Sequence, residues 1–98
     1  MNAQPIVAEL YTTEECSLCS EMRSVLERLR GEYSLAIREI DIRADASLLV
    51  RFAQEIPVLY LDGRKAFKHR VSEAALRRKL AFLLWQRRIL GVAAKETN

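Results

Sequence analysis

Two cysteines three positions apart lie where the sequence changes from a strand-like to a helical pattern of apolar residues. Residues 6–11 are rich in the residue types that favour strands, and residues 12–15 carry no apolar period. From Cys16 onward the apolar side chains recur at helical offsets, at Leu18, Met22, Val25, Leu26 and Leu29. Gly31 follows as the expected C′ residue. The sequence therefore predicts a strand, a short loop and a helix that begins at Cys16.

The next part of the chain continues to alternate strand and helix patterns. Residues 35–42 predict a second strand, and the irregular alternation of their apolar side chains favours a strand covered on both faces. Asp45 is expected to cap a helix over about residues 46–54. Residues 58–61 and 64–68 predict two strands joined by Asp62-Gly63, a dipeptide that two-residue hairpins favour because both positions need positive φ.

The last predicted element is a helix capped by Ser72, with a leucine stripe at Leu76, Leu80, Leu83 and Leu84. The order of elements is then βαβαββα. Strands that alternate with helices indicate a parallel first pair, and the hairpin adds two antiparallel strands to the same sheet. We expect an α/β fold with a mixed four-stranded sheet flanked by helices. One domain should span residues 1–98, with a loose tail at about residues 91–98.

Composition narrows the chemistry of the cysteine pair. Half of the residues are apolar and 30% are charged, which is typical of a globular domain. No run of about 18 uncharged apolar residues is present, and the N-terminus lacks the basic and apolar regions of a signal peptide. We therefore expect a cytoplasmic protein with no membrane partner. Thiols are kept reduced there, so a catalytic or metal-binding pair is favoured over a structural bridge.

The position of the pair predicts different roles for its members. At a helix start, unpaired N–H groups and the helix dipole lower the pKa of a thiol toward neutrality, which makes Cys16 the expected nucleophile. Cys19, one turn deeper, should be less exposed and should resolve the mixed disulfide. A closed zinc site needs four ligands, and one chain offers only Cys16, Cys19 and His69, so no metal site is expected within it. Two chains could still share an iron–sulfur cluster or metal through four thiolates.

The combination of motifs resembles the glutaredoxin branch of the thioredoxin superfamily over roughly residues 5–85. The resemblance rests on the strand that ends in Tyr11, on Cys-Ser-Leu-Cys at residues 16–19, on Ile56-Pro57-Val58 and on the hairpin. It implies a thioredoxin-like fold and a thiol–disulfide oxidoreductase. The substrate would be a disulfide-bearing protein or a glutathione mixed disulfide.

The same resemblance implies roles for residues around the cysteines. Pro57 would be a cis proline beside the pair, and the backbone of Ile56 would pair with an extended substrate segment. Tyr11, Ser17 and Leu18 would complete the substrate groove. No cofactor would be required, and the electrons would come from glutathione or from a reductase partner of the thioredoxin-reductase type.

Three segments depart from the family pattern. Thr13, Glu14 and Glu15 stand where glutaredoxins typically carry a lysine, and carboxylates raise the pKa of a nearby thiol, so Cys16 should be less acidic than in the family. Residues 17–18 are Ser-Leu rather than Pro-Tyr. Residues 68–73 replace the Gly-Gly-Asp type segment that holds glutathione. Lys68, His69 and Arg70, near a helix N-terminus, are the remaining candidates to receive a carboxylate from an anionic partner such as glutathione.

The last predicted helix is strongly basic. Residues 1–62 hold 6 basic and 11 acidic side chains, whereas residues 64–88 hold 9 basic and 1 acidic. No recognised nucleic-acid motif accompanies this charge, so we interpret it as a solvated face and expect no nucleic-acid partner. A non-catalytic module that binds a protein through this helix, and the two-chain metal carrier, are the alternatives to an enzyme.

The apolar side chains of this helix lie on two sides. Phe82, Trp85 and Ile89 gather nearly opposite the leucine stripe, while Arg87 falls in the centre of that stripe. One core cannot bury both sides. Either the helix changes direction near Gln86, or the second face contacts another chain or an acidic partner. We predict that Phe82, Trp85 and Ile89 form a contact surface, with a homodimer seam as one candidate.

Overall fold

A computed structural model describes the backbone of residues 4–97 and the side chains of residues 4–90. Its elements, in chain order, are β1 (Ile6–Thr12), α1 (Ser17–Tyr33), β2 (Leu35–Asp41), the short 3-10 helix η1 (Ile42–Ala44), α2 (Ala46–Phe52), β3 (Val58–Leu61), β4 (Arg64–Lys68) and α3 (Glu73–Thr97). The four strands form one sheet in the order β2-β1-β3-β4. β1 and β2 are parallel, and β3 is antiparallel to both β1 and β4. The predicted α/β architecture and element order are confirmed.

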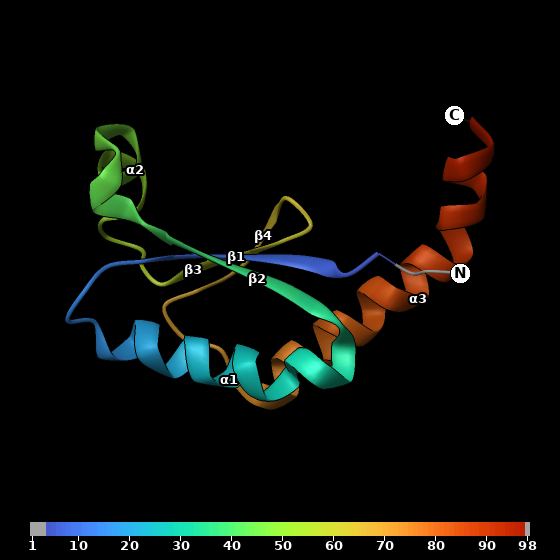
Figure 1. Cartoon of the computed structure of the whole chain (residues 1–98), viewed down its shortest axis with the longest axis horizontal. Coiled ribbons are helices and arrows are strands. Elements are labelled where there is room, and N and C mark those ends of the chain that lie inside the picture. Colours follow the sequence, from blue (N-terminus) through green and yellow to red (C-terminus); the bar gives the residue numbers. More distant parts are fainter. Residues whose placement is uncertain (1–3, 98) are drawn as a thin grey trace.

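Helices cover both faces of the sheet. Figure 1 shows α1 and α3 below it and α2 above it. β1 alternates between the two sides, so Ile6, Ala8 and Leu10 are buried in the main core against α1 and α3. The side chain of Tyr11 packs against a smaller core on the α2 side, which is built around Phe52. The sheet therefore has α1 and α3 on one face and α2 on the other.

Local chemistry sets several element boundaries where we expected them. Asp45 caps α2, because its Oδ1 accepts a hydrogen bond from the Ser47 N–H at 2.9 Å. Ser72 caps α3 in the same way, with its Oγ accepting from the Ala75 N–H at 3.0 Å. In the hairpin, Asp62 and Gly63 have φ of 50° and 84°. Both turn positions are therefore left-handed, as a two-residue hairpin of this type requires.

The end of α1 lies three residues beyond the predicted one. Gly31 is inside the helix, and the left-handed residue is Ser34, with φ 55° and ψ 63°. The Ser34 N–H donates to the Arg30 carbonyl, and the Ser34 carbonyl accepts from the Ile6 N–H at 3.1 Å. The prediction that Gly31 ends the helix is wrong, because the chain must travel further to reach the start of β2 beside β1.

The prediction that residues 35–42 form a strand covered on both faces is also wrong. β2 is an edge strand and is buried only at Leu35, while Arg38 and Glu39 are exposed. The strand ends at Asp41, and Ile42 begins η1 and is buried beneath α2. The slip in alternation therefore reflects a strand that passes into a helical turn.

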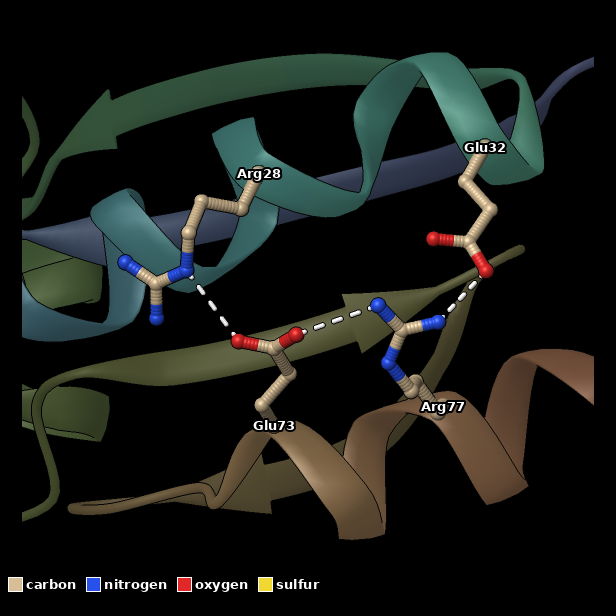
Figure 2. Close-up of polar contacts among 4 residues, drawn as sticks. All are labelled: Arg28, Glu32, Glu73 and Arg77. Atoms are coloured by element: carbon tan, nitrogen blue, oxygen red, sulfur yellow. Dashed lines mark hydrogen bonds and ion pairs between the residues drawn. The ribbon is translucent and has the colours of Figure 1, made fainter.

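An ion-pair network links α1 to α3. Figure 2 shows Glu73 between Arg28 of α1 and Arg77 of its own helix, at 3.1 Å from each, and Arg77 also reaches Glu32 of α1. These hydrogen bonds, that of Arg28 first and that of Arg77 second, hold the pKa of Glu73 below its ordinary value. The network fixes the start of α3 against α1.

α3 continues well past the leucine stripe. Leu76 and Leu80 are buried, Leu83 and Leu84 are partly buried, and the ribbon then runs away from the sheet toward the C-terminal end (Figure 1). The helix extends to Thr97, over most of the segment for which we expected a loose tail. Residue 98 and the side chains of residues 91–97 lie outside the described part, so whether that tail packs stays a prediction. Within residues 4–97 no helix is both long enough and apolar enough to cross a membrane.

Arg87 has a specific place in the leucine stripe. Its guanidinium donates to Asp62 Oδ2 at 2.9 Å, to the Pro5 carbonyl at 3.3 Å and to the Gln4 carbonyl. Asp62 Oδ1 in turn accepts from the Val7 N–H at 2.9 Å. A charged residue therefore continues the core face of α3 where the core ends, and it joins the helix to the hairpin and to the start of β1.

Candidate functional site

Cys16 is the N-cap residue of α1, with an extended backbone of φ −119° and ψ 107°. Its Sγ accepts a hydrogen bond from the Cys19 N–H at 3.1 Å. The two residues are joined by a disulfide, and their Cα atoms are 5.2 Å apart. The sulfur of Cys16 thus occupies the place that a capping oxygen takes in other helices, where unpaired N–H groups stabilise negative charge.

The two sulfurs differ in their access to solvent. Cys19 is fully buried at 0% exposure, whereas Cys16 is partly exposed. The difference follows from helix geometry, since Cys19 lies one turn into α1 on the face that packs on the sheet. Of the two sulfurs, that of Cys16 is therefore the accessible one.

Three segments meet at the end of the sheet where β1 ends and β3 begins. Tyr11, near the end of β1, pairs with Val58 at the start of β3, so the loop that leads to Cys16 and the residue before β3 lie at the same end of the sheet. The Ile56–Pro57 peptide bond is cis, as the resemblance implied, and Pro57 is buried. The His69 N–H donates to the Pro57 carbonyl at 2.8 Å, which brings the chain after β4 to this end of the sheet as well.

A cavity of about 300 Å³ lies between the first two turns of α1 and the segment before α3. Leu18 and Glu21 line it from α1, and His69 and Arg70 line it from the opposite side. Met22, Val71 and Ser72 complete the lining. Two of the three predicted anion contacts therefore face the helix that carries the cysteines. Lys68 is exposed on β4 and is not among the lining residues.

Tyr11 and Ile56 have side chains that pack on the α2 side of the sheet. The Tyr11 ring lies 4.6 Å from that of Phe52 and 5.5 Å from that of Tyr60, centroid to centroid. Burial raises the pKa of Tyr11, and Glu9 and Tyr60 add to the increase. Ile56 packs in the same small core, and its N–H donates to the Phe52 carbonyl at 3.1 Å. That N–H is already used, so the predicted backbone pairing of Ile56 with a substrate segment could use only its carbonyl.

The acidic loop before Cys16 has a cation beside it that we did not predict. Arg43 lies 3.4 Å from Glu14 and 2.8 Å from Asp41. Asp41 first, and Glu14 to a lesser degree, raise the pKa of the Arg43 guanidinium. Glu15 adopts a left-handed conformation with φ 58° just before the cap. One of the two loop carboxylates is therefore paired, so the loop is less acidic than its sequence indicates.

Sequence reasoning also missed Glu21 and Ser72 as neighbours of the site. Glu21 lies one helical turn after Leu18, which is a signal that could have placed both on one face of α1. That this face meets residues 69–72 depends on how α3 approaches the sheet, and no local pattern carries that information. Within the described residues of one chain, no group of three or more His, Cys, Asp or Glu side chains could hold a metal ion. The two-chain carrier is untested by this finding.

Comparison with known protein families gives one match of broad coverage. A family model described as "Glutaredoxin-like domain (DUF836)" matches residues 8–81. This range holds both cysteines, Pro57 and the segment that lines the cavity. The prediction of one domain over residues 1–98 extends beyond the match and stays a prediction.

Similar proteins and structures point the same way. "Uncharacterized protein Rv0508" of Mycobacterium tuberculosis is 32% identical over 78 residues, which cover 74% of this chain and 80% of that one. The solution NMR structure of protein Ne2328 from Nitrosomonas europaea has a TM-score of 0.67 at 23% identity, over 81% of this chain and 98% of that one. A mutant thioredoxin from Halobacterium salinarum has a TM-score of 0.60 at 22% identity, over 79% and 73%. These structures establish a thioredoxin-like fold. The cysteine pair makes redox chemistry possible in that fold.

Proposed function

Because the chain belongs to the glutaredoxin-like domain family, we propose that it is a thiol–disulfide oxidoreductase in which Cys16 is the nucleophile and Cys19 the resolving thiol. The observation that carries the proposal is the asymmetry of the pair. The sulfur of Cys16 caps α1 by accepting from the Cys19 N–H, and Cys16 is partly exposed, while Cys19 is fully buried. A structural bridge would need no such difference.

The proposed exchange has two steps. The Cys16 thiolate attacks one sulfur of a substrate disulfide, which forms a mixed disulfide and releases the other substrate sulfur as a thiolate. The Cys19 thiol then loses its proton and attacks the Cys16 sulfur, forming the Cys16–Cys19 disulfide and releasing the second substrate sulfur. The substrate gains two electrons and two protons in all. A dithiol reductase or two glutathione thiols would return the pair to the reduced state.

The cavity beside Leu18 supplies the proposed contact for a substrate or donor. His69 and Arg70 offer donors to a carboxylate, and Leu18 offers an apolar wall. Glu21 on the same cavity opposes a second negative charge. Residues 68–73 lack the Gly-Gly-Asp type segment that holds glutathione, so a protein disulfide reduced by a dithiol donor is the favoured substrate class.

Reduction assays with two substrates test the proposal. We expect Cys16→Ser to abolish turnover of both a protein disulfide and a glutathione mixed disulfide. Cys19→Ser should abolish the former but retain turnover of the latter with excess glutathione, because glutathione can resolve the mixed disulfide. Melting temperatures close to that of the reduced parent protein in both variants would serve as the control for folding. Full activity in Cys16→Ser would refute the nucleophile assignment.

The electron donor is tested separately. Arg70→Ala should raise the KM for glutathione several-fold without changing kcat, because the residue binds and takes no part in exchange. Lys68→Ala, which removes a cation outside the cavity, is the matched control and should leave KM unchanged. Equal KM values for Arg70→Ala and the parent protein would remove glutathione from this cavity.

A further inference from the structure

A second and larger cavity is lined by residues that all follow the cysteine pair by more than 40 positions in the sequence. It has a volume of about 540 Å³ and runs between the β3–β4 hairpin, at residues 61–65, and the part of α3 between Lys79 and Leu90. At 1.5 Å per residue this part of the helix is about 17 Å long. We call this cavity and its walls the α3 groove. Its length suits an occupant of about three helical turns.

Cations border the α3 groove. Arg64, Lys65, Lys79 and Arg87 line it, and Asp62 is its one acidic side chain. The Asp62 carboxylate is already bound by Arg87 and by the Val7 N–H. Lys65 pairs with Glu55, but across the described residues neither Arg64 nor Lys79 forms an ion pair. Two positive charges of the groove therefore have no partner within the part of the chain described.

Apolar side chains continue the groove onto the outer face of α3. Phe82, Trp85, Ile89 and Leu90 are 47%, 55%, 53% and 55% exposed. The rings of Phe82 and Trp85 lie 5.9 Å apart, and Lys79 Nζ lies 5.6 Å from the centre of the Phe82 ring. Exposed aromatic side chains are typical of the centre of a protein interface, and charged side chains are typical of the rim around it.

From this geometry we infer that the α3 groove is the docking site for an acidic amphipathic segment of a partner protein. The segment would place apolar side chains on Phe82 and Trp85 and carboxylates beside Arg64 and Lys79. Such a helix-in-groove mode needs apolar anchors at helical spacing on one face and charge of opposite sign around them. The inference does not depend on the exchange reaction, because none of these residues lies at the cysteine pair.

Charge decides between this partner and a second copy of the chain. Residues 74–90 contain no acidic side chain, and Arg78 and Arg88 are exposed on the helix that carries the apolar face. A two-fold seam through Phe82, Trp85 and Ile89 would bring the basic side chains of both helices together, with no carboxylate within residues 74–90 of either chain to offset them. An acidic partner removes this repulsion.

Trp85 is the only tryptophan in the chain, and its ring lies beside that of Phe82, which lines the groove, so its fluorescence should report on an occupant. The probe is a tryptophan-free helical peptide of about 14 residues with leucines at i, i+3, i+4 and i+7 spacing and glutamates elsewhere. Titration should shift the Trp85 emission to shorter wavelength, saturate, and protect the ring from acrylamide. A peptide with lysine in place of each glutamate, and one with serine in place of each leucine, should bind at least about tenfold more weakly.

Matched variants assign the binding to named residues. Phe82→Ser should weaken binding of the acidic peptide about tenfold or more, while Val50→Ser, at an 89% exposed apolar position on α2, should not. Arg64→Glu combined with Lys79→Glu should bind the lysine peptide better than the glutamate peptide. Melting temperatures close to that of the parent would show that each variant is folded.

Four results would overturn the inference. The first two are the absence of a saturable shift with the acidic peptide, and equal binding of the lysine peptide by the parent protein. The third is a larger Trp85 shift with vesicles of phosphatidylcholine and phosphatidylglycerol than with the peptide. The fourth is dimerisation in sedimentation that buries Trp85 without a peptide. The last result would instead support a homodimer seam.

Discussion

The sulfur of Cys16 accepts a hydrogen bond from the N–H of Cys19 at 3.1 Å, so one member of the pair uses the backbone of the other. This donor and the helix N-terminus favour a thiolate at Cys16 once the disulfide is reduced. We expect the pKa of the reduced Cys16 thiol to lie below that of a free cysteine. The pH dependence of alkylation by iodoacetamide measures it, with Cys19→Ser as the background so that only one thiol reacts.

The acidic loop should oppose this effect. Glu15→Gln removes the carboxylate next to Cys16 and should lower the pKa of the thiol further, because a like charge no longer disfavours the thiolate. Glu14→Gln should have a smaller effect, since Arg43 already offsets the Glu14 carboxylate. A pKa that rises in Glu15→Gln would contradict this account of the loop.

The Asp62–Arg87 pair should stabilise the fold cooperatively. Asp62→Ala and Arg87→Ala should each lower the free energy of unfolding by about 1–2 kcal/mol, because both side chains are only about one-third exposed and each loses several hydrogen bonds. The double variant should lose less than the sum of the two. Strict additivity in urea unfolding would mean that the two residues act independently.

Two glycines should respond in opposite directions to alanine. Gly63 has φ 84°, so Gly63→Ala should destabilise the protein by about 1 kcal/mol through backbone strain in the turn. Gly31 lies inside α1, and a Cβ built there meets nothing within 4 Å. Gly31→Ala should therefore stabilise the protein by about 0.5–1 kcal/mol. Thermal unfolding of both variants checks the pair, and a destabilised Gly31→Ala would contradict the extended α1.

Glu73 should make stability depend on acid pH. Its pKa is below the ordinary 4.5, so its contribution is fully present above that pH and is lost as the pH falls through the lowered value. Glu73→Gln should be less stable than the parent at pH 7, and the difference should shrink as the pH falls below about 4. Glu27→Gln, whose pair with Arg30 lies within one exposed helix turn, is the control and should show a smaller difference. A constant difference between Glu73→Gln and the parent from pH 7 to pH 3 would exclude the ion pairs as its cause.

Elements that depend on neighbouring residues were predictable from the sequence. The caps at Asp45 and Ser72 and the turn at Asp62-Gly63 each follow from the chemistry of one residue and the backbone next to it. The end of α1 was not predictable in this way, because Ser34 becomes left-handed where the chain must join the sheet. Local propensity favoured Gly31, and tertiary pairing overrode it.

The features of the candidate site likewise divide into those that local sequence predicts and those that depend on distant contacts. The positions of Cys16 and Cys19 on α1, and the greater burial of Cys19, follow from helical spacing alone. The pairing of Glu14 with Arg43 and the cavity that joins Leu18 to Arg70 depend on contacts between distant segments. The charge of Arg87 within the leucine stripe was visible as a conflict in the sequence, but its explanation needed Asp62, which lies 25 residues from Arg87.

Trapping of the mixed disulfide tests the central claim most directly. The reduced Cys19→Ser variant, mixed with a peptide disulfide, should form one covalent adduct at Cys16 within the time in which the reduced parent protein completes exchange. The reduced Cys16→Ser variant should form little or none, because Cys19 is fully buried. Mass spectrometry of the digested proteins identifies the modified residue. An adduct at Cys19 that forms as fast as the one at Cys16 would contradict the assignment of nucleophile and resolving thiol.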